Sequence, residues 1–265
     1  MNGNSSGTAG KAERAVPESD RIRWSTVRDS LTQPYRVTVS MVVLVSLVPC
    51  YIFIADLIPK RALHVPALAM DALVPLQPIW TLVYAPLYLF VIMLPVFVVR
   101  QQEQIRRTVH AYLLVWITAF AFFLAYPTMA PRPLKVIGEG FAFWSLRFLY
   151  SLDPPYNCFP SLHVAHSFVS ALTCYRVHRG VGIAAGIAAS LIGISTLFTR
   201  QHYIADVVAG TFLAFVAYVV FLHGCRRDAV PELERRLAPV LALGIISFIA
   251  LVLGGFWIAY RVTGE

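Results

Sequence analysis

The chain has 265 residues, of which 58% are hydrophobic and only 14% are charged. Soluble domains carry about 25% charged residues, so this composition, with a mean hydropathy of +0.66, excludes an ordinary soluble domain and indicates a polytopic membrane protein. The formal charge of +8 raises the question of nucleic-acid binding, which the distribution of the charges answers below. The four cysteines have no paired spacing, so we expect free side chains in apolar surroundings and no disulfide framework.

The chain divides into three predicted regions. Residues 1–20 contain too little apolar surface to fold and are predicted to be a disordered tail. Residues 21–36 are basic and are expected to lie on the membrane surface. Residues 37–260 are predicted to form one membrane-embedded, all-α catalytic domain. Its seven predicted spans are Val37–Ile58, Leu76–Val99, Thr108–Tyr126, Pro160–Tyr175, Val181–Phe198, Tyr203–His223 and Leu237–Tyr260.

The basic residues favour one orientation of these spans. With the N-terminus in the cytoplasm, fifteen Lys and Arg residues lie in the inner segments and seven in the outer ones. Topology and anionic lipid therefore explain the basic excess, and nucleic acid is not an expected partner. We expect an integral membrane protein, of a bacterial inner membrane, with its site on the extracytoplasmic (periplasmic or lumenal) face.

Two histidine clusters lie at the edges of consecutive apolar runs. His163 stands in CFPSLHVAHS and His202 in STLFTRQHYIADV, with one predicted span leaving the first cluster and the next returning to the second. An apolar helix of about 20 residues crosses a bilayer, so two crossings return the chain to the face it left. The two histidines are therefore predicted to meet at one membrane surface.

His202 and Asp206 are separated by four residues at the start of the sixth predicted span. This spacing places both side chains on one helix face. The carboxylate can hold one imidazole nitrogen and leave the other free as a nucleophile or base. The alternative is a polar pair that satisfies itself inside the bundle, although ionisable groups at membrane depth are usually functional.

The sequence Pro160-Ser161-Leu162-His163 opens the fourth predicted span. Proline suits a helix start, and the free N–H groups there attract an anion such as phosphate. His163 would then stand beside the anion as a general acid, or else be an ordinary interfacial residue. His166, one turn deeper, is interpreted as a packing residue behind the site.

Arg132 and Arg200 are predicted to lie on the same outer face as the histidines. Each alone can be explained by snorkelling to lipid headgroups. Two arginines, two histidines and a helix N-terminus on one surface favour a site for an oxyanion. His163, His202 and Asp206 would also suffice as three zinc ligands, but neighbouring arginines repel a cation. No metal and no cofactor are therefore expected.

The outer segment Phe141–Tyr150, FAFWSLRFLY, is dense in aromatic residues. It is predicted to be an interfacial helix, and it also suits a wall past which a lipid enters. The fifth predicted span contains Gly182-x-x-x-Gly186, a spacing typical of closely packed membrane helices.

Together, these motifs resemble the type 2 phosphatidic acid phosphatase superfamily over Tyr126–Gly210, whose motifs read K-x6-R-P, P-S-G-H and S-R-x5-H-x3-D. The resemblance implies a six-helix core, here with a seventh C-terminal span, and catalysis without a metal. It implies that His202 is the nucleophile forming a phosphohistidine, oriented by Asp206. It further implies that His163 protonates the leaving oxygen and that Arg132 and Ser161 hold the phosphoryl oxygens.

The sequence departs from the family pattern at three positions. Ala125 replaces the lysine of the first motif, Leu162 replaces a glycine, and Thr196 replaces the arginine of the third motif. Arg200 lies four residues after Thr196, so we expect it one helical turn away on the same face, with Thr196 behind the site. Lys135 is a second candidate for the missing charge. These departures resemble the branch that contains inositol phosphorylceramide synthases.

The missing charges bear on the substrate. A phosphomonoester carries nearly two negative charges and a phosphodiester carries one, so fewer basic groups suit the diester. We expect a transferase that moves a phosphorylated, inositol phosphate-like headgroup from a phospholipid to a lipid alcohol. The alternatives are a lipid phosphate phosphatase that uses water, and a non-catalytic lipid or anion transporter or scaffold.

Overall fold

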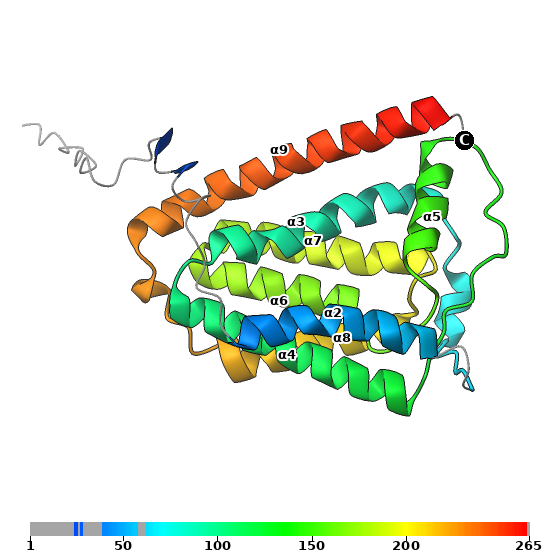
Figure 1. Cartoon of the computed structure of the whole chain (residues 1–265), viewed down its shortest axis with the longest axis horizontal. Helices are drawn as coiled ribbons and strands as arrows, with labels where there is room; N and C mark the ends of the chain where they lie inside the picture. Colours follow the sequence, from blue (N-terminus) through cyan, green and yellow to red (C-terminus); the bar gives the residue numbers. More distant parts are fainter. Residues whose placement is uncertain (1–23, 26, 29–38, 58–61, 264–265) are drawn as a thin grey trace, which may run out of the picture.

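The computed structural model of the chain describes residues 24–25, 27–28, 39–57 and 62–263. The predicted tail 1–20 and most of the predicted surface segment 21–36 lie outside these residues. The described residues form an all-α bundle without a β-strand, so the predicted fold class is confirmed (Figure 1). Its helices are α2 (Val39–Leu57), α3 (Thr81–Val98), α4 (Gln102–Ala125), α5 (Phe141–Leu152), α6 (Leu162–Val177), α7 (Arg179–Phe198), α8 (Ile204–Ala217) and α9 (Glu232–Thr263). A π-helical turn, Tyr218–Leu222, extends α8, and 3-10 turns occur at Ala69–Leu73, Pro78–Trp80 and Arg227–Ala229.

Five helices are long and apolar enough to cross a membrane: Pro78–Val98, Gln102–Ala125, Arg179–Phe198, Ile204–Leu222 and Glu232–Thr263. The other two predicted spans correspond to α2, which is apolar over Met41–Ala55, and to α6. Helix α6 has only 16 residues. At 1.5 Å per residue it is about 24 Å long, less than the roughly 30 Å of a hydrocarbon core. If the C-terminal end of α6 reaches one surface of the bundle, its N-terminal residues therefore lie below the opposite surface.

Helix α6 occupies the centre of the bundle and contacts α3, α4, α7, α8 and α9 (Figure 1). Leu162, Ala165 and Val169 on α6 belong to an apolar cluster shared with α2, α4 and α8. A second cluster, shared with α3, α7 and α9, contains Cys174 and Val177 of α6. Because both clusters use α6, packing fixes its position from two sides. The four cysteines are free, as predicted.

Two glycines permit close approaches next to α6. A Cβ on Gly182 would lie 2.3 Å from the Cα of Tyr175, so the turn joining α6 and α7 requires a glycine there. A Cβ on Gly186 would meet no atom of the described chain within 4 Å. The predicted close packing at the pair of glycines therefore holds for the first glycine and not for the second.

Gly210 of α8 lies against the residue that precedes α6. A Cβ at this position would lie 2.5 Å from the carbonyl oxygen of Ser161. We expect Gly210→Ala to displace the start of α6 and to destabilise the protein by about 1–3 kcal/mol, as over-packed sites do. Thermal unfolding in detergent measures this effect. Gly186→Ala is the matched control, because added volume meets open space there; an equal change in Tm for the two variants contradicts the expectation.

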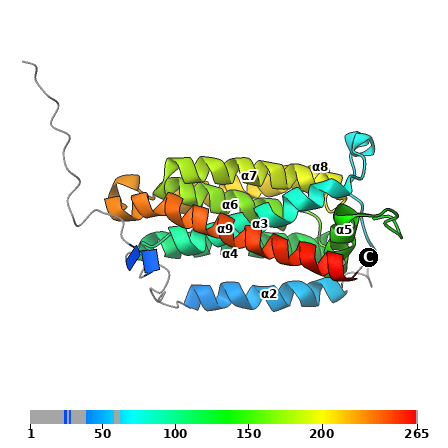
Figure 2. The same ribbon diagram turned by 90° about the horizontal axis from the view of Figure 1, so that it is seen from above.

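Helix α5 lies across one end of the bundle, beside the end of α9 (Figures 1 and 2). The ring centroids of Phe141 and Tyr260 are 5.6 Å apart, and those of Phe148 and Phe256 are 5.4 Å apart. Arg147 donates a hydrogen bond to the carbonyl of Gly138, at 3.1 Å. The aromatic segment is thus a helix at one end of the bundle, as expected of an interfacial element. Figure 2 also shows α2 at the periphery of the bundle.

Candidate active site

The loops at this end of the bundle fix the start of α6. The buried hydroxyl oxygen of Thr128 accepts hydrogen bonds from the backbone N–H groups of Cys158 and Phe159, at 3.1 and 3.0 Å. This joins the segment that leads to Arg132 to the segment that leads to α6. The hydroxyl of Ser161 accepts from the N–H of Val164 at 3.3 Å, which makes Ser161 the N-cap of α6.

The two predicted histidines meet at this end. His163 Nδ1, in the first turn of α6, lies 3.1 Å from His202 Nε2, in the loop before α8. The prediction that the two crossings bring these residues together is confirmed. His202 is buried, at 6% exposed, whereas His163 is partly exposed.

Asp206 approaches the other nitrogen of His202. Its Oδ2 lies 3.4 Å from His202 Nδ1 and accepts a hydrogen bond from the N–H of Tyr203 at 2.8 Å. The predicted origin of the contact is wrong: α8 begins at Ile204, so His202 precedes the helix and the two side chains do not share a helix face. The His202–Asp206 contact is an ion-pair distance without hydrogen-bond geometry, an alignment that substrate binding often tightens.

A buried aspartate that we did not predict from the sequence supports the same loop. Asp71 accepts hydrogen bonds from the N–H groups of Leu68 (2.7 Å) and Ile204 (2.9 Å). It therefore satisfies a free donor at the start of α8, two residues after His202. Thr196 also supports this loop: its carbonyl accepts from the N–H groups of Gln201 and His202, at 2.9 and 3.2 Å. Thr196 is fully buried, as expected for a residue behind the site.

The guanidinium groups of Arg132 and Arg200 have different partners. Arg132 Nη2 is 3.6 Å from the carboxylate of Asp153, and its guanidinium stacks on the ring of Tyr150 at 4.4 Å. Arg200 donates to the carbonyl of Val74 at 2.8 Å. The predicted placement of Arg200 one helical turn beyond Thr196 is wrong, because α7 ends at Phe198 and Arg200 has a left-handed φ of 52°.

The other two predicted site residues, Lys135 and His166, do not contact the histidine pair through any hydrogen bond or ion pair of the described chain. Lys135 is exposed in the loop after Arg132. His166 is buried between the rings of Tyr112 and Trp116, at 5.4 and 5.3 Å, and borders an apolar cavity of about 540 Å³ between α2, α3 and α4. This position agrees with a packing role for His166.

A small cavity borders the two histidines. Its lining consists mostly of polar side chains: Tyr51, Asp153, Pro154, Tyr156, Asn157, Leu162, His163, Gln201 and His202. The free volume is about 10 Å³, close to the minimum that one water needs. A phosphoryl group therefore fits between the histidines only if the two rings move apart. Asp153, Asn157 and Gln201 were missed because they occupy irregular loops and belong to none of the motifs.

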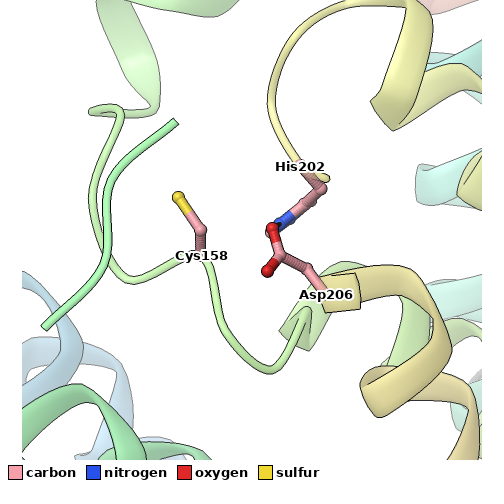
Figure 3. A group of neighbouring side chains, drawn as sticks. All are labelled: Cys158, His202 and Asp206. Atoms are coloured by element: carbon pink, nitrogen blue, oxygen red, sulfur yellow. Dashed lines mark ion pairs between the residues drawn. The ribbon is translucent and has the colours of Figure 1, made fainter. Parts of the chain in front are cut away.

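Three of the buried groups form a cluster that resembles a metal site. The ligand atoms of Cys158, His202 and Asp206 lie within 4.8 Å of one another (Figure 3). This donor set differs from the zinc alternative considered above, in which His163 takes the place of Cys158. Zinc binds thiolate and not thiol, and burial raises the pKa of the Cys158 thiol well above its usual value. Cys158 Sγ also donates to the carbonyl of Pro155 at 3.5 Å, and Asp206 Oδ2 accepts from the N–H of Tyr203 at 2.8 Å, so two of the three donors already have partners within the protein. These contacts argue against a resident cation.

We expect activity to survive EDTA and to be inhibited by vanadate, which mimics pentacoordinate phosphorus. The physical reason is that two of the three possible donors already have partners in the protein: Cys158 Sγ donates to the carbonyl of Pro155 at 3.5 Å, and Asp206 Oδ2 accepts from the N–H of Tyr203 at 2.8 Å. The measurement is turnover before and after chelation, with Cys158→Ser as the control, which should keep at least about half of the activity. Loss of activity in EDTA that zinc restores contradicts this expectation.

The fold and the site define an integral membrane helix bundle with a histidine pair, backed by a carboxylate, at one end. A sequence model of the PAP2 superfamily matches residues 64–220, more than half of the chain, and the chain belongs to this superfamily. It is also similar to a PA-phosphatase related-family protein of Dictyostelium discoideum, with 28% identity over 130 residues. That alignment covers 45% of this chain and 23% of the relative, so the chain spans about a quarter of the relative's length. No solved structure matches.

Proposed function

We propose that the protein is a metal-independent enzyme that cleaves a lipid phosphate ester through a phosphohistidine on His202. In the version that we favour, it transfers a phosphorylated headgroup from a phospholipid to a lipid alcohol, as in the branch that contains inositol phosphorylceramide synthases. The observation that carries this proposal is the line of groups Asp206, His202 and His163, with 3.4 and 3.1 Å between neighbouring partners. This order supplies an orienting carboxylate, a nucleophile and an acid.

In the first step, His202 Nε2 attacks the phosphorus of the donor lipid. The N–P bond forms and the bond from phosphorus to the diacylglycerol oxygen breaks. His163, which enters this step protonated, gives its proton to the departing oxygen. Asp206 lies at His202 Nδ1 and stabilises the positive charge that develops on the ring. Arg132 and the start of α6 at Ser161 hold the phosphoryl oxygens.

In the second step, the hydroxyl of a lipid alcohol attacks the phosphohistidine. His163, now neutral, accepts the hydroxyl proton while the N–P bond breaks and the P–O bond to the acceptor forms. The proton count closes, because His163 ends protonated as it began. Water in place of the alcohol gives hydrolysis, which is the phosphatase alternative.

An apolar cavity supports a lipid partner beside His163. It has a volume of about 310 Å³ and lies between α3, α5 and α9. Tyr84 and Tyr88 line it, and their ring centroids lie 5.7 and 5.0 Å from that of His163. Trp144 and Phe148 of α5 also line it. A lipid chain in this cavity brings its oxygen to His163 and excludes water from that side.

The charges support a diester over a monoester. Asp153 pairs with Arg132, and Arg200 is directed to the carbonyl of Val74. The small cavity beside the histidines therefore carries little net positive charge. Such a site suits the single charge of a phosphodiester better than the nearly doubled charge of a monoester.

The region 37–260 is proposed to be the catalytic domain, with the N-terminus in the cytoplasm and the site on the extracytoplasmic face. Labelling of cysteines introduced at Lys135, in the loop beside the site, and at Arg179, at the opposite end of α7, by a membrane-impermeant reagent tests this orientation. Labelling from outside at position 135 and not at position 179 is the expected result. The reverse pattern overturns the orientation.

Purified enzyme in vesicles tests the proposed reaction. The donors are phosphatidylinositol and phosphatidic acid, and the acceptors are ceramide and diacylglycerol. We expect transfer from phosphatidylinositol to an acceptor to exceed release of phosphate from phosphatidic acid. Fast phosphate release with no transfer to either acceptor leaves the phosphatase. Lipid binding without turnover of any donor leaves the transporter or scaffold.

A further inference from the structure

The histidine pair lies between two environments of opposite polarity. The apolar cavity of α3, α5 and α9 approaches His163 through Tyr84 and Tyr88. The small cavity, which both histidines border, is also lined by Asp153, Asn157 and Gln201. A phosphorus atom held at the histidines therefore lies near an apolar cavity and also near hydrogen-bonding groups.

Asn157 is the unexplained member of the polar side. It is 4% exposed, yet neither its Nδ2 nor its Oδ1 has a hydrogen-bond partner within the part of the chain that the structure describes. Buried amides are normally paired, because an unsatisfied donor or acceptor loses the hydrogen bonds it made to water. The amide borders the cavity, whose free volume of about 10 Å³ admits no more than one water. Both polar atoms of Asn157 are therefore available to a ligand once substrate binding moves the two rings apart and enlarges this cavity.

The carboxylate of Asp153 is the second polar group that borders this cavity. Its Oδ2 accepts a hydrogen bond from Gln201 Nε2 at 3.0 Å and lies 3.6 Å from Arg132 Nη2. A carboxylate there repels a phosphate but accepts hydrogen bonds from hydroxyl groups. Arg132 already balances its charge, so the cavity favours a neutral hydroxyl ligand over an ammonium group. Asn157 complements it, because an amide both donates to and accepts from a hydroxyl.

We propose that Asp153 and Asn157 form a subsite that recognises the hydroxyl groups of a polyhydroxylated phosphodiester headgroup. This inference rests on the proposed function, because the headgroup must stay bonded to the phosphorus that His202 attacks. The lipid chains leave past His163 on the apolar side, and the headgroup stays on the polar side. The two residues determine which headgroup is transferred, whereas the histidines perform the transfer.

Asn157→Gly tests the subsite. Asn157 has a left-handed φ of 59°, which glycine adopts without strain, so this change removes the amide with the least effect on the backbone. The measurement is the ratio of kcat/KM for phosphatidylinositol to that for phosphatidylcholine, whose headgroup has no hydroxyl. We expect this ratio to fall by about tenfold or more, the effect of one or two lost hydrogen bonds. A second variant, Asp153→Asn, removes the charge opposite Arg132 and should shift preference from phosphatidylinositol towards phosphatidic acid.

The outcomes separate this inference from the proposed function. An equal loss for both diesters in Asn157→Gly means a structural role and overturns the subsite, as does an unchanged ratio. A rise in the KM of the acceptor alone assigns the hydroxyl to the acceptor and overturns the headgroup assignment. A wild type that hydrolyses only phosphatidic acid overturns the proposed transfer and the subsite with it. If Asn157→Gly fails to accumulate, an unchanged preference in Asp153→Asn has the same force against the subsite.

Discussion

His202→Ala is expected to lower turnover by about 10⁴-fold or more, the scale on which enzymes lose activity when a covalent nucleophile is removed. The physical reason is the position of the ring: Nε2 faces His163 at 3.1 Å, and Asp206 lies at Nδ1. No other side chain that lines the small cavity combines a free nucleophilic nitrogen with a carboxylate behind it. Turnover of a labelled phospholipid, with Tm measured in parallel, checks this expectation.

A substitution of His166 provides the matched control for His202→Ala. His166 is also buried, and it also lies on the inside of the bundle, but it contacts Tyr112 and Trp116 and does not line the small cavity. His166→Ala removes the same side-chain atoms as His202→Ala and should therefore lose comparable packing while keeping activity within about tenfold of the wild type. If His202→Ala retains covalent label from the substrate, or if both variants lose activity equally, His202 is not the nucleophile.

The second large effect that we expect is the loss of activity in His163→Ala. With an alkyl phosphodiester as donor, we expect a loss of about 10²–10⁴-fold, the usual contribution of a general acid. With a nitrophenyl phosphodiester the leaving group needs no proton, so the first step should proceed without His163. The second step still lacks a base. The variant should therefore release about one equivalent of nitrophenol per enzyme and then stall.

Stopped-flow absorbance measures this burst. The wild type is the reference and should turn over the nitrophenyl substrate continuously. Continuous turnover by His163→Ala contradicts the assignment of the acid and base to His163. A uniform loss for alkyl and nitrophenyl substrates also contradicts it, because a leaving group that needs no proton should be rescued.

Periodicity and topology made the bundle and the meeting of the histidines predictable. Apolar runs long enough to cross a bilayer locate the helices, and two consecutive crossings return His163 and His202 to the same end. The absence of paired spacing separately predicted that the cysteines are free. The positions of the helices depend on hydrophobic burial summed over many residues. Their prediction therefore survives an error of a few positions in any helix boundary.

The polar contacts of the site were harder to predict, because they depend on the exact residue at which a helix ends and on the course of loops. Arg200 was misplaced because α7 ends at Phe198, two residues before it, so helical spacing no longer applies. Asp71, Asp153 and Asn157 lie in segments whose course is set by hydrogen bonds between loops, such as those of Thr128. No period in the sequence encodes such contacts. The signal that was available is the presence of Asp153 in the same outer loop as Arg132.

The mass of the covalent adduct on His202 tests the central claim most directly. His163→Ala is mixed with a nitrophenyl diester of the headgroup, quenched in base because phosphohistidine is labile in acid, digested and analysed by mass spectrometry. The account predicts that the peptide containing His202 carries a phosphoryl group with the headgroup still attached. A bare phosphoryl group on that peptide, or an adduct on any other residue, would contradict headgroup transfer through His202.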